Sequence, residues 1–248
     1  MSVHSINIVI PMAGQGSRFS KAGYLKPKPF IDVLGKPMIA HVLENLSVPD
    51  ARYILIARQE HLEANPQEVA YIQENFNVEF IPLSSLTMGA ACTVLAAHRL
   101  IRSNTPLLIA NSDQLVDCDI NEYISDAQVQ ALDGSILTFE DSDPKWSYVR
   151  LNELGLVTEV KEKAVISNKA TVGIYYFARG ENFTDYALDM IVANDTVNRE
   201  FYVCPVYNYL IRSHARVGIW DIDKSAMHGI GTPEDLDAYL AWRKKHDN

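Results

Sequence analysis

The chain has 248 residues, of which 48% are hydrophobic and 21% are charged, and its 22 basic and 31 acidic residues give a formal net charge of −9. This composition is typical of a globular protein and excludes an intrinsically disordered chain. The acidic balance argues against a general binder of nucleic acid or lipid surfaces. No apolar run approaches the roughly 20 residues of a membrane-spanning helix, and three widely spaced cysteines indicate neither a disulfide framework nor a zinc site. We therefore expect a cytoplasmic protein without a nucleic-acid or membrane partner.

Short apolar runs alternate with amphipathic segments in the first half of the chain. The apolar runs predict buried strands, and apolar positions at helical spacing predict the helices between them. Expected strands cover residues 6–10, 53–57, 78–83 and 106–110, and expected helices begin at Pro37 and cover 61–76 and 89–101. This β-α-β-α order favours an α/β fold with a mostly parallel central sheet and helices on both faces.

The pattern changes after Gly134, where predicted strands follow one another more closely. Residues 148–151 and 156–160, joined by Glu153-Leu154-Gly155, predict an antiparallel hairpin. Further strands are expected at 135–139, 171–177 and 216–222, and helices at 181–192, 201–211 and from Thr232 onward. That last helix begins with an N-cap hydroxyl, a proline and two acidic residues. The simplest interpretation is one α/β domain over residues 1–248 with an inserted antiparallel part.

A glycine-rich turn follows the first predicted strand. Gly14 and Gly16 let the chain turn sharply and bring backbone N–H groups close to a phosphate. The turn is not a dinucleotide fingerprint, because Phe19 stands at the third glycine position. Two cations follow the turn. They are Arg18 and Lys28, and Lys28 has a proline on each side. Cations held this rigidly suit the stabilisation of a leaving pyrophosphate.

The chain resembles the sugar-1-phosphate nucleotidyltransferases in two stretches, Ile10-Pro-Met-Ala-Gly-Gln-Gly-Ser-Arg-Phe19 and Lys26-Pro-Lys-Pro-Phe-Ile-Asp-Val-Leu-Gly-Lys-Pro-Met38. The resemblance implies a Rossmann-like nucleotide-diphospho-sugar transferase fold. It also implies a reaction in which an NTP and a sugar 1-phosphate give an NDP-sugar and pyrophosphate. In this reading, residues from 1 to about 133 bind the nucleotide and residues 134–248 bind the sugar phosphate.

The resemblance also assigns roles to residues of the glycine-rich turn and its neighbours. Ala13, Gly14 and Gly16 would bind the nucleotide. Arg18 and Lys28 would be the catalytic cations, which hold the triphosphate and stabilise the departing pyrophosphate.

A possible metal site follows the predicted strand at 106–110. Ser112 and Asp113 come directly after it, and ligands of parallel sheets bind beyond the carboxyl ends of the strands. Mg²⁺ takes few carboxylates together with phosphate oxygens, and the resemblance assigns Asp113 to the metal and Ser112 to the nucleotide. The alternative is a strand-end aspartate that caps a turn. The nearby Asp117-Cys118-Asp119 spells a DxD motif, but Asp119 is better explained as a helix N-cap.

The second metal ligand departs from the family pattern. The family carries an aspartate two residues before a Gly-Thr pair, and here that position is Gly229, before Gly231-Thr232. We favour Asp223 over Asp221 as the substitute, because Asp223 lies nearer the carboxyl end of its strand. His228 is a poorer candidate, since Mg²⁺ prefers oxygen ligands.

Gly89 begins a predicted helix. The resemblance implies that it contacts the nucleobase, and the alternative is close packing of the helix on the sheet. In the first case, leucine at position 89 should abolish nucleotide binding while the fold survives.

The candidate acceptor residues lie in the second half of the chain. Glu162 and Lys163 resemble the family's Glu-Lys pair, since a carboxylate can accept from sugar hydroxyls and an ammonium can meet the phosphate. A solvated strand end is the alternative. The resemblance also assigns Tyr148 and Gly173 to the substrate, and Ser147 stands where the family has glycine.

The expected mechanism is an in-line attack of the acceptor phosphate on the α-phosphorus, with Mg²⁺ as cofactor and no covalent enzyme intermediate. The expected partners are an NTP and a sugar phosphate, and a homo-oligomer is compatible with the sequence. Two other functions stay open: a cytidylyltransferase acting on another phosphorylated small molecule, and a non-catalytic nucleotide-sugar-binding regulatory protein. The sequence leaves the nucleobase and the acceptor undetermined.

Overall fold

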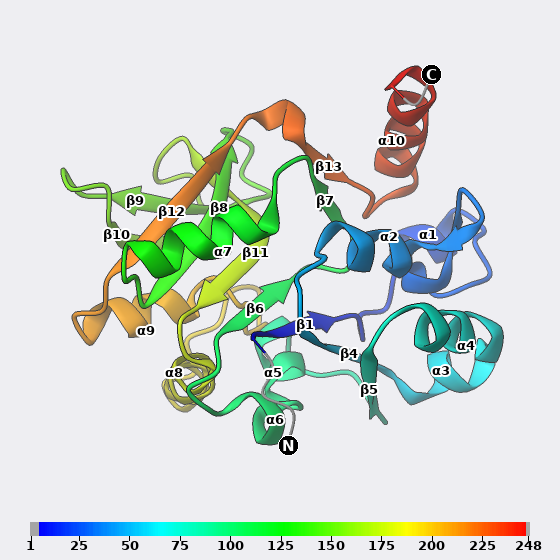
Figure 1. Ribbon diagram of the computed structural model, residues 1–248, viewed down its shortest axis with the longest axis horizontal. Helices are drawn as coiled ribbons and strands as arrows, with labels where there is room; N and C mark the ends of the chain where they lie inside the picture. The colour runs from blue at the N-terminus through cyan, green and yellow to red at the C-terminus, as the bar shows by residue number, and fades with distance from the viewer. Residues whose placement is uncertain (1–4, 247–248) are drawn as a thin grey trace.

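A computed structural model describes residues 5–246 and shows a nine-stranded sheet through the centre of the molecule (Figure 1). The strand order is β10-β9-β11-β6-β1-β4-β5, with β8 paired to β11 and β12 paired to β8. The strands are β1 (Asn7–Pro11), β4 (Arg52–Arg58), β5 (Val78–Leu83), β6 (Leu107–Ala110), β8 (Gly134–Glu140), β9 (Ser147–Leu151), β10 (Val157–Glu162), β11 (Lys169–Phe177) and β12 (Val217–Ile222).

Parallel pairing joins β1 to β4 and β6, β4 to β5, and β8 to β12. Antiparallel pairing joins β11 to β6, β8 and β9, and β9 to β10. The predicted α/β class is therefore confirmed, with a mainly parallel centre and an added antiparallel hairpin formed by β9 and β10.

Helices cover both faces of this sheet (Figure 1). They are α1 (Ser17–Lys21), α2 (Met38–Asn45), α3 (Gln59–Ala64), α4 (Pro66–Asn75), α5 (Ala90–Leu95), α6 (His98–Ile101), α7 (Ile120–Val129), α8 (Gly180–Val192), α9 (Val206–Arg212) and α10 (Pro233–His246). Strand β1 shows why two layers form. Ile8 and Ile10 belong to the core cluster that includes α2 and α7, whereas Val9 belongs to the second cluster, which includes α5 and α8. Side chains alternate across a strand, so one fully apolar strand supplies two cores.

Some predicted helices are interrupted. The segment predicted as a helix at 61–76 is two helices that meet at Asn65, because Pro66 lacks the N–H that a continuing helix needs and instead opens α4. The segment 89–101 likewise divides into α5 and α6. The helix predicted at 201–211 begins only at Val206, after Pro205.

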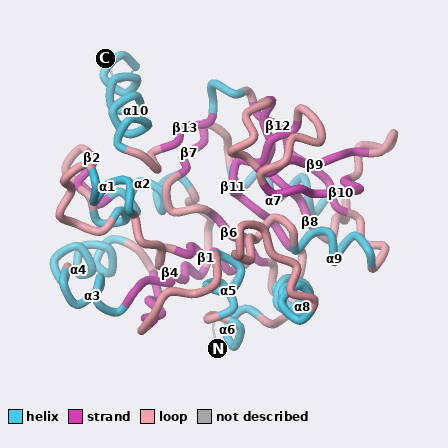
Figure 2. The backbone as a smooth tube through the Cα atoms, turned by 180° about the vertical axis from the view of Figure 1, so that it is seen from behind, coloured by secondary structure: helices cyan, strands magenta, loops and turns pink. Residues whose placement is uncertain are grey.

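Two small sheets were not predicted from the sequence. They are β2 (Asp32–Val33) with β3 (Lys36–Pro37), and β7 (Gln114–Val116) with β13 (Met227–Gly229). Strands of two or three residues are too short to show an alternating pattern. The second pair matters for the site because it brings the chain before α10 beside the end of β6. The backbone tube shows β13 leading from this pair into α10 (Figure 2).

Two smaller observations complete the fold. Asp119 is the N-cap of α7, as predicted, and its carboxylate accepts a hydrogen bond from the Asn121 backbone N–H at 2.8 Å. Within residues 5–246, no helix is both long enough and apolar enough to cross a membrane.

Candidate active site

The glycine-rich turn lines a cavity of about 450 Å³. Ala13 and Gly14 form one wall after β1, and Gly89 and Thr93 at the start of α5 form another. Gly16 adopts a left-handed conformation (φ +59°), and a Cβ there would lie 3.4 Å from the Cβ of Lys28. The turn therefore packs against the lysine segment that the sequence analysis assigned to the phosphates.

Gly89 is required by packing. Its φ is +116°, and a Cβ built there would lie 2.6 Å from the Phe201 carbonyl oxygen. The Phe201 N–H donates to the Met88 carbonyl at 2.7 Å, and its carbonyl accepts from the Ala91 N–H at 3.0 Å. The expectation that leucine at 89 would leave the fold intact is therefore wrong, because any side chain there must displace backbone.

Lys28 and Asp113 form the centre of the site. The lysine Nζ lies 2.7 Å from Asp113 Oδ2, and the two side chains are 21% and 22% exposed. The chain after β13 passes close to Asp113, since the Ile230 backbone N–H donates to the Asp113 backbone carbonyl at 2.9 Å. A Cβ at Gly231 would lie 2.4 Å from Asp113 Oδ2, so this crossing requires glycine. Ser112, directly before Asp113, is buried.

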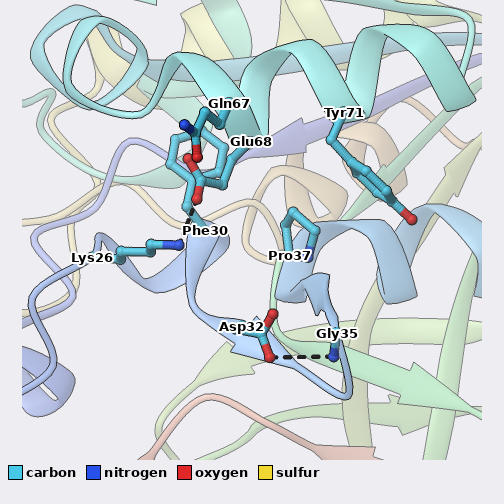
Figure 3. A pocket seen from close by; sticks show the side chains of 8 residues that line it. All are labelled: Lys26, Phe30, Asp32, Gly35, Pro37, Gln67, Glu68 and Tyr71. Atoms are coloured by element: carbon cyan, nitrogen blue, oxygen red, sulfur yellow. Dashed lines mark hydrogen bonds and ion pairs between the residues drawn. The ribbon is translucent and has the colours of Figure 1, made fainter.

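The other lysine of the proline-flanked segment has a different partner. Lys26 extends toward α4 and pairs with Glu68, at a nitrogen–oxygen distance of 2.5 Å (Figure 3). Only one of the two lysines therefore reaches the Asp113 carboxylate.

A larger cavity of about 950 Å³ is lined by Asp113. Arg18, Gly229 and Asp235 line it, together with Trp146 and Gln114. Gln114 Oε1 and Trp146 Nε1 are buried and have no hydrogen-bond partner within residues 5–246. Buried polar atoms are rarely left unpaired in proteins, so this cavity is suited to a polar ligand.

The structure changes the choice of second carboxylate. Asp223 does not line the larger cavity; its exposed carboxylate accepts from the Ser225 N–H at 2.8 Å and from its hydroxyl at 2.5 Å. A Cβ at Gly229 would instead lie 3.9 Å from Asp235 Oδ2. Asp235, in the first turn of α10, is thus the carboxylate beside the position where the family has aspartate.

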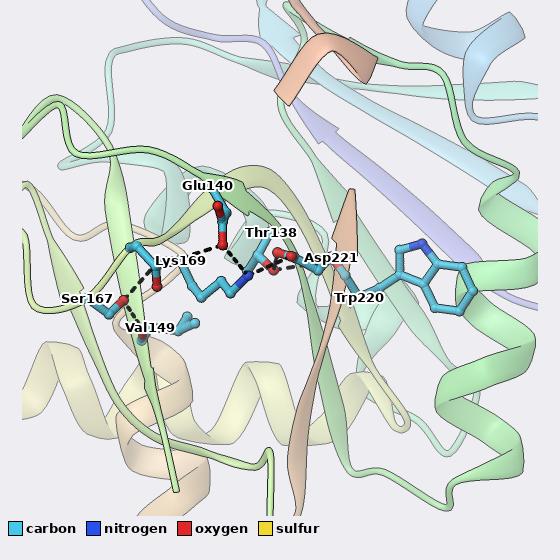
Figure 4. A network of polar contacts seen from close by, with 8 residues as sticks. Thr138, Glu140, Val149, Ser167, Lys169, Trp220 and Asp221 are labelled. Atoms are coloured by element: carbon cyan, nitrogen blue, oxygen red, sulfur yellow. Dashed lines mark hydrogen bonds and ion pairs between the residues drawn. The ribbon is translucent and has the colours of Figure 1, made fainter. Parts of the chain in front are cut away.

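Asp221 is committed to a separate network (Figure 4). Its carboxylate accepts from Lys169 Nζ at 2.7 Å and from the Thr138 hydroxyl at 2.8 Å, and Lys169 also pairs with Glu140. His228 is likewise engaged, with Nε2 at 2.7 Å from Asp117 Oδ2. Neither residue is free to replace a ligand at position 229.

These residues fit a magnesium ion that shares its coordination with a nucleotide. Within residues 5–246, no group of three or more His, Cys, Asp or Glu side chains could hold a metal alone. Mg²⁺ is commonly held by one or two carboxylates plus substrate phosphates. Asp113 and Asp235 offer oxygen donors of this kind, and Asp235 has no partner for its carboxylate within the described chain.

Glu162 and Ser147 face each other across the β9–β10 hairpin, and the Ser147 hydroxyl donates to Glu162 Oε2. Burial raises the pKa of Glu162, and this hydrogen bond opposes the rise. Lys163 follows in a left-handed conformation (φ +54°) and donates its backbone N–H to the Trp146 carbonyl at 3.1 Å. Its ammonium donates to the Tyr202 hydroxyl at 2.6 Å.

Two predicted substrate residues make close contacts within the protein. The Tyr148 side chain is fully buried and donates its hydroxyl to the Asp143 carbonyl at 2.7 Å, so it cannot contact a substrate. Gly173 (φ +97°) lies against Asn111, where a Cβ would come within 2.2 Å of the amide nitrogen. Glycine is therefore required here to give Asn111 room at the end of β6, and the assignment of Gly173 to the substrate stays a prediction.

Sequence reasoning missed Asp235, Tyr202 and Glu200. The Thr232-Pro-Glu-Asp sequence is typical of a helix start, and this accounts for Asp235 without any role at the site. The sequence therefore offered no reason to consider it as a metal ligand. Tyr202 and Glu200 carry no motif, and only the folded chain brings them to the 450 Å³ cavity.

Comparison with known proteins agrees with this geometry. Residues 8–201 match the model of the family described as nucleotidyl transferase. The chain belongs to this family. Among curated relatives, a mannose-1-phosphate guanyltransferase of Gibberella zeae is 24% identical over 92% of this chain and 61% of its own length. The catalytic subunit beta of mannose-1-phosphate guanylyltransferase from Drosophila melanogaster is 27% identical over 68% of this chain and 47% of its own. The chain thus spans about half to three-fifths of these relatives.

Solved structures of this nucleotidyl transferase's fold include a nucleoside-diphosphate-sugar pyrophosphorylase from Vibrio cholerae. It superposes with a TM-score of 0.82 at 24% identity, over 94% of this chain and 99% of that one. A UDP-glucose pyrophosphorylase in complex with UDP-glucose gives a TM-score of 0.78 at 18% identity, over 97% and 99%. At these identities the likeness establishes the shared fold.

Proposed function

We propose that this chain transfers a nucleotidyl group from an NTP to a sugar 1-phosphate and releases pyrophosphate. The observation that carries the proposal is the meeting of Lys28 and Asp113, 2.7 Å apart, beside the glycine-rich turn. It unites one cation for phosphates and one carboxylate for a metal at the carboxyl end of β6. Ligands of open α/β sheets bind at such ends.

The nucleotide enters the 450 Å³ cavity in this proposal. Ala13 and Gly14 bring backbone to it, and Gly89 forms another wall. Gly16, next to Lys28, and the buried Ser112, next to Asp113, would act on the phosphate side of the nucleotide. The triphosphate then extends toward Arg18 and Lys28. Lys28 exchanges the Asp113 carboxylate for phosphate oxygens, and this exchange frees the carboxylate.

Mg²⁺ would be held by Asp113, with Asp235 as the second carboxylate. When bound, the ion neutralises charge on the nucleotide phosphates. The protein contributes the fixed position of Asp113, since the backbone crossing at Gly231 leaves this carboxylate little freedom to move.

The acceptor is bound by Glu162 and Lys163 in this proposal. Glu162 is oriented by Ser147 to accept hydrogen bonds from hydroxyl groups, and the Lys163 ammonium meets the acceptor phosphate. The acceptor's phosphate oxygen, which is ionised at neutral pH, attacks the α-phosphorus in line. No general base is needed, and Lys28 and Arg18 stabilise the charge that accumulates on pyrophosphate.

Pyrophosphate release by wild type and Lys28→Ala tests this assignment. Because the lysine acts mainly on charge that develops in the transition state, kcat should fall about 100- to 1000-fold. The nucleotide Kd should change by less than about 3-fold. Lys26→Ala is the matched control, since Lys26 is tied to Glu68, and it should keep nearly full turnover. A loss confined to nucleotide affinity would remove Lys28 from the catalytic role.

A further inference from the structure

The Lys163 side chain is held by two contacts with one tyrosine. Its ammonium donates to the Tyr202 hydroxyl at 2.6 Å and lies 4.6 Å from the centre of the same ring. The Tyr202 hydroxyl in turn donates to Glu200 Oε2 at 2.5 Å. Burial and the Glu200 carboxylate raise the pKa of Tyr202, so the phenol keeps the proton that this second bond needs. The Lys163 side chain, which we expect to bind the acceptor phosphate, is therefore ordered before any acceptor binds.

Tyr202 belongs to a short segment, residues 197–202, that is fixed from the nucleotide side of the molecule. Val197 and Glu200 exchange two backbone hydrogen bonds, of 3.0 and 2.9 Å, around a turn whose two central residues are left-handed. Phe201 then makes its two backbone hydrogen bonds to Met88 and Ala91, on either side of Gly89. The segment 197–202 is thus attached to the N-terminus of α5, while Tyr202 reaches the lysine that follows β10.

The same side chains also line the nucleotide cavity. Glu200 and Tyr202 face the 450 Å³ space together with Ala13 and Gly14. A nucleotide in that space meets the two residues that hold Lys163. One contact chain therefore joins the nucleotide cavity to the acceptor lysine, through a tyrosine that no motif marks.

We propose that Tyr202 is a positioning residue that fixes the Lys163 ammonium and couples its hold on the acceptor phosphate to occupancy of the nucleotide cavity. This inference rests on the proposed function. A charge-assisted hydrogen bond restrains a flexible lysine in advance, so less ordering remains for the acceptor to impose. The coupling is reciprocal, as for any two linked binding sites.

A double-mutant cycle on the full chain tests the pairing. The variants are Tyr202→Phe, which removes the hydroxyl and keeps the ring, Lys163→Met, and the two combined. We use mannose 1-phosphate or glucose 1-phosphate, whichever the wild type turns over. Tyr202→Phe should raise the KM for this acceptor about 3- to 10-fold and change kcat less than about 2-fold, as expected for a lost charge-assisted contact. In the Lys163→Met background, the same substitution should change KM by less than about 1.5-fold.

Tyr209→Phe is the matched control. The Tyr209 hydroxyl lies 3.1 Å from the Asp195 carboxylate, and Arg212 lies 4.6 Å from its ring centre. A tyrosine with a carboxylate and a cation beside it therefore occurs among residues that line neither cavity. This control should leave the acceptor KM unchanged. Calorimetric titration of the acceptor with and without a bound NTP, in EDTA so that no turnover occurs, should show a coupling factor in wild type that falls to about 1 in Tyr202→Phe.

Two results would overturn the inference. One is additivity of the Tyr202 and Lys163 substitutions in acceptor KM, and the other is an unchanged coupling factor in Tyr202→Phe. If wild type turns over no acceptor, the proposed function fails separately, and the pairing is then read from lysine-selective NMR with inorganic phosphate as probe. The resonance missing in Lys163→Met must then move in Tyr202→Phe, and an unmoved resonance would refute the pairing.

Discussion

Lys28 and Asp113 neutralise each other in the free protein, and each is expected to take a different partner when substrate binds. An ammonium 2.7 Å from Asp113 Oδ2 occupies the space that a metal ion on that oxygen would need. The metal is therefore expected to arrive with the nucleotide, whose phosphates draw the lysine away. Lys28→Met should then bind Mn²⁺, used as a probe for Mg²⁺, more tightly than wild type when no nucleotide is present. Equal or weaker Mn²⁺ binding in this variant, measured by electron paramagnetic resonance, would contradict the exchange.

The choice between the two later carboxylates can be decided in the same assay with a nucleotide present. Asp113→Asn should weaken Mn²⁺ binding about 10-fold or more, because it removes the anchoring carboxylate. Asp235→Asn should weaken it by a smaller factor. Asp223→Asn is the control and should bind as wild type, since its carboxylate is exposed and bonded to Ser225. If Asp223→Asn weakens Mn²⁺ binding and Asp235→Asn does not, the second metal ligand is Asp223, as the sequence predicted.

Glu162 gives a pH-dependent prediction. Burial raises the pKa of its carboxyl group, so the folded chain binds this proton more tightly than the unfolded chain does. The ionised carboxylate therefore lowers stability above the raised pKa, and this loss disappears as the pH falls through that pKa toward the unfolded value. Glu162→Gln should melt at a higher temperature than wild type at pH 8, with the difference vanishing near pH 4.

Glu159→Gln, on the same strand, supplies the comparison for that melting series. Glu159 pairs with Arg150 and Lys161 near the surface, so its substitution should give no gain at pH 8. A Glu162→Gln advantage that grows as the pH falls would show that the sign is wrong.

Residues that stand in local sequence motifs could be proposed for the site from the sequence, whereas residues that only the fold brings to the site could not. Lys28, Gly16 and Asp113 stand in or directly beside recognisable sequence, and the structure brings them together. Tyr148 was assigned by its neighbours, although strand alternation opposes it: Ser147 faces Glu162, so Tyr148 must point to the other face. Asp235 reaches the site only because β13 pairs with β7.

At the scale of elements, the contact between the start of α5 and segment 197–202 is the most exacting packing in the site. Gly89→Ala places a Cβ 2.6 Å from the Phe201 carbonyl oxygen and holds alanine at φ +116°. Overpacking and backbone strain should together lower the free energy of unfolding by about 3 kcal/mol. Urea unfolding of the purified chain measures this loss.

Gly155→Ala separates strain from collision. Gly155 also has a positive φ, +75°, but a Cβ there would meet no atom within 4 Å. This variant should lose only about 1 kcal/mol, the strain alone. If both variants lose the same free energy of unfolding, the collision with the Phe201 backbone contributes nothing and the prediction is wrong.

Element prediction succeeded where periodicity is long and failed where proline or brevity decides. The apolar runs of β1, β4 and β6 identify buried parallel strands, and α8 follows its predicted range closely. Pro66 and Pro205 instead set boundaries that apolar spacing does not show. The strand pair β7–β13 depends on two segments more than 100 residues apart, and no local pattern reports such a partner.

At the scale of the whole molecule, one sheet carries strands from both halves of the chain, and the site lies where they meet. Strands β6 and β11 pair antiparallel, so the end of β6 with Asp113 lies beside Gly173 of β11. The residues proposed for the nucleotide, from the first half, and those proposed for the acceptor, from the second, are thereby brought to one sheet. No local sequence pattern predicts that the two halves of the chain share one sheet. The sequence predicts it only through its resemblance to a family whose fold has this arrangement.

The most direct test of the account is a reaction panel with the full chain. Each of four NTPs is incubated with Mg²⁺ and, in turn, with mannose 1-phosphate, glucose 1-phosphate and phosphorylated small molecules that are not sugars, and products are quantified by chromatography. We expect at least one NTP and sugar 1-phosphate pair to give NDP-sugar and pyrophosphate in equal amounts, and we expect Asp113→Asn to abolish both. Turnover only with a non-sugar acceptor, or nucleotide binding without pyrophosphate release in any combination, would contradict this expectation.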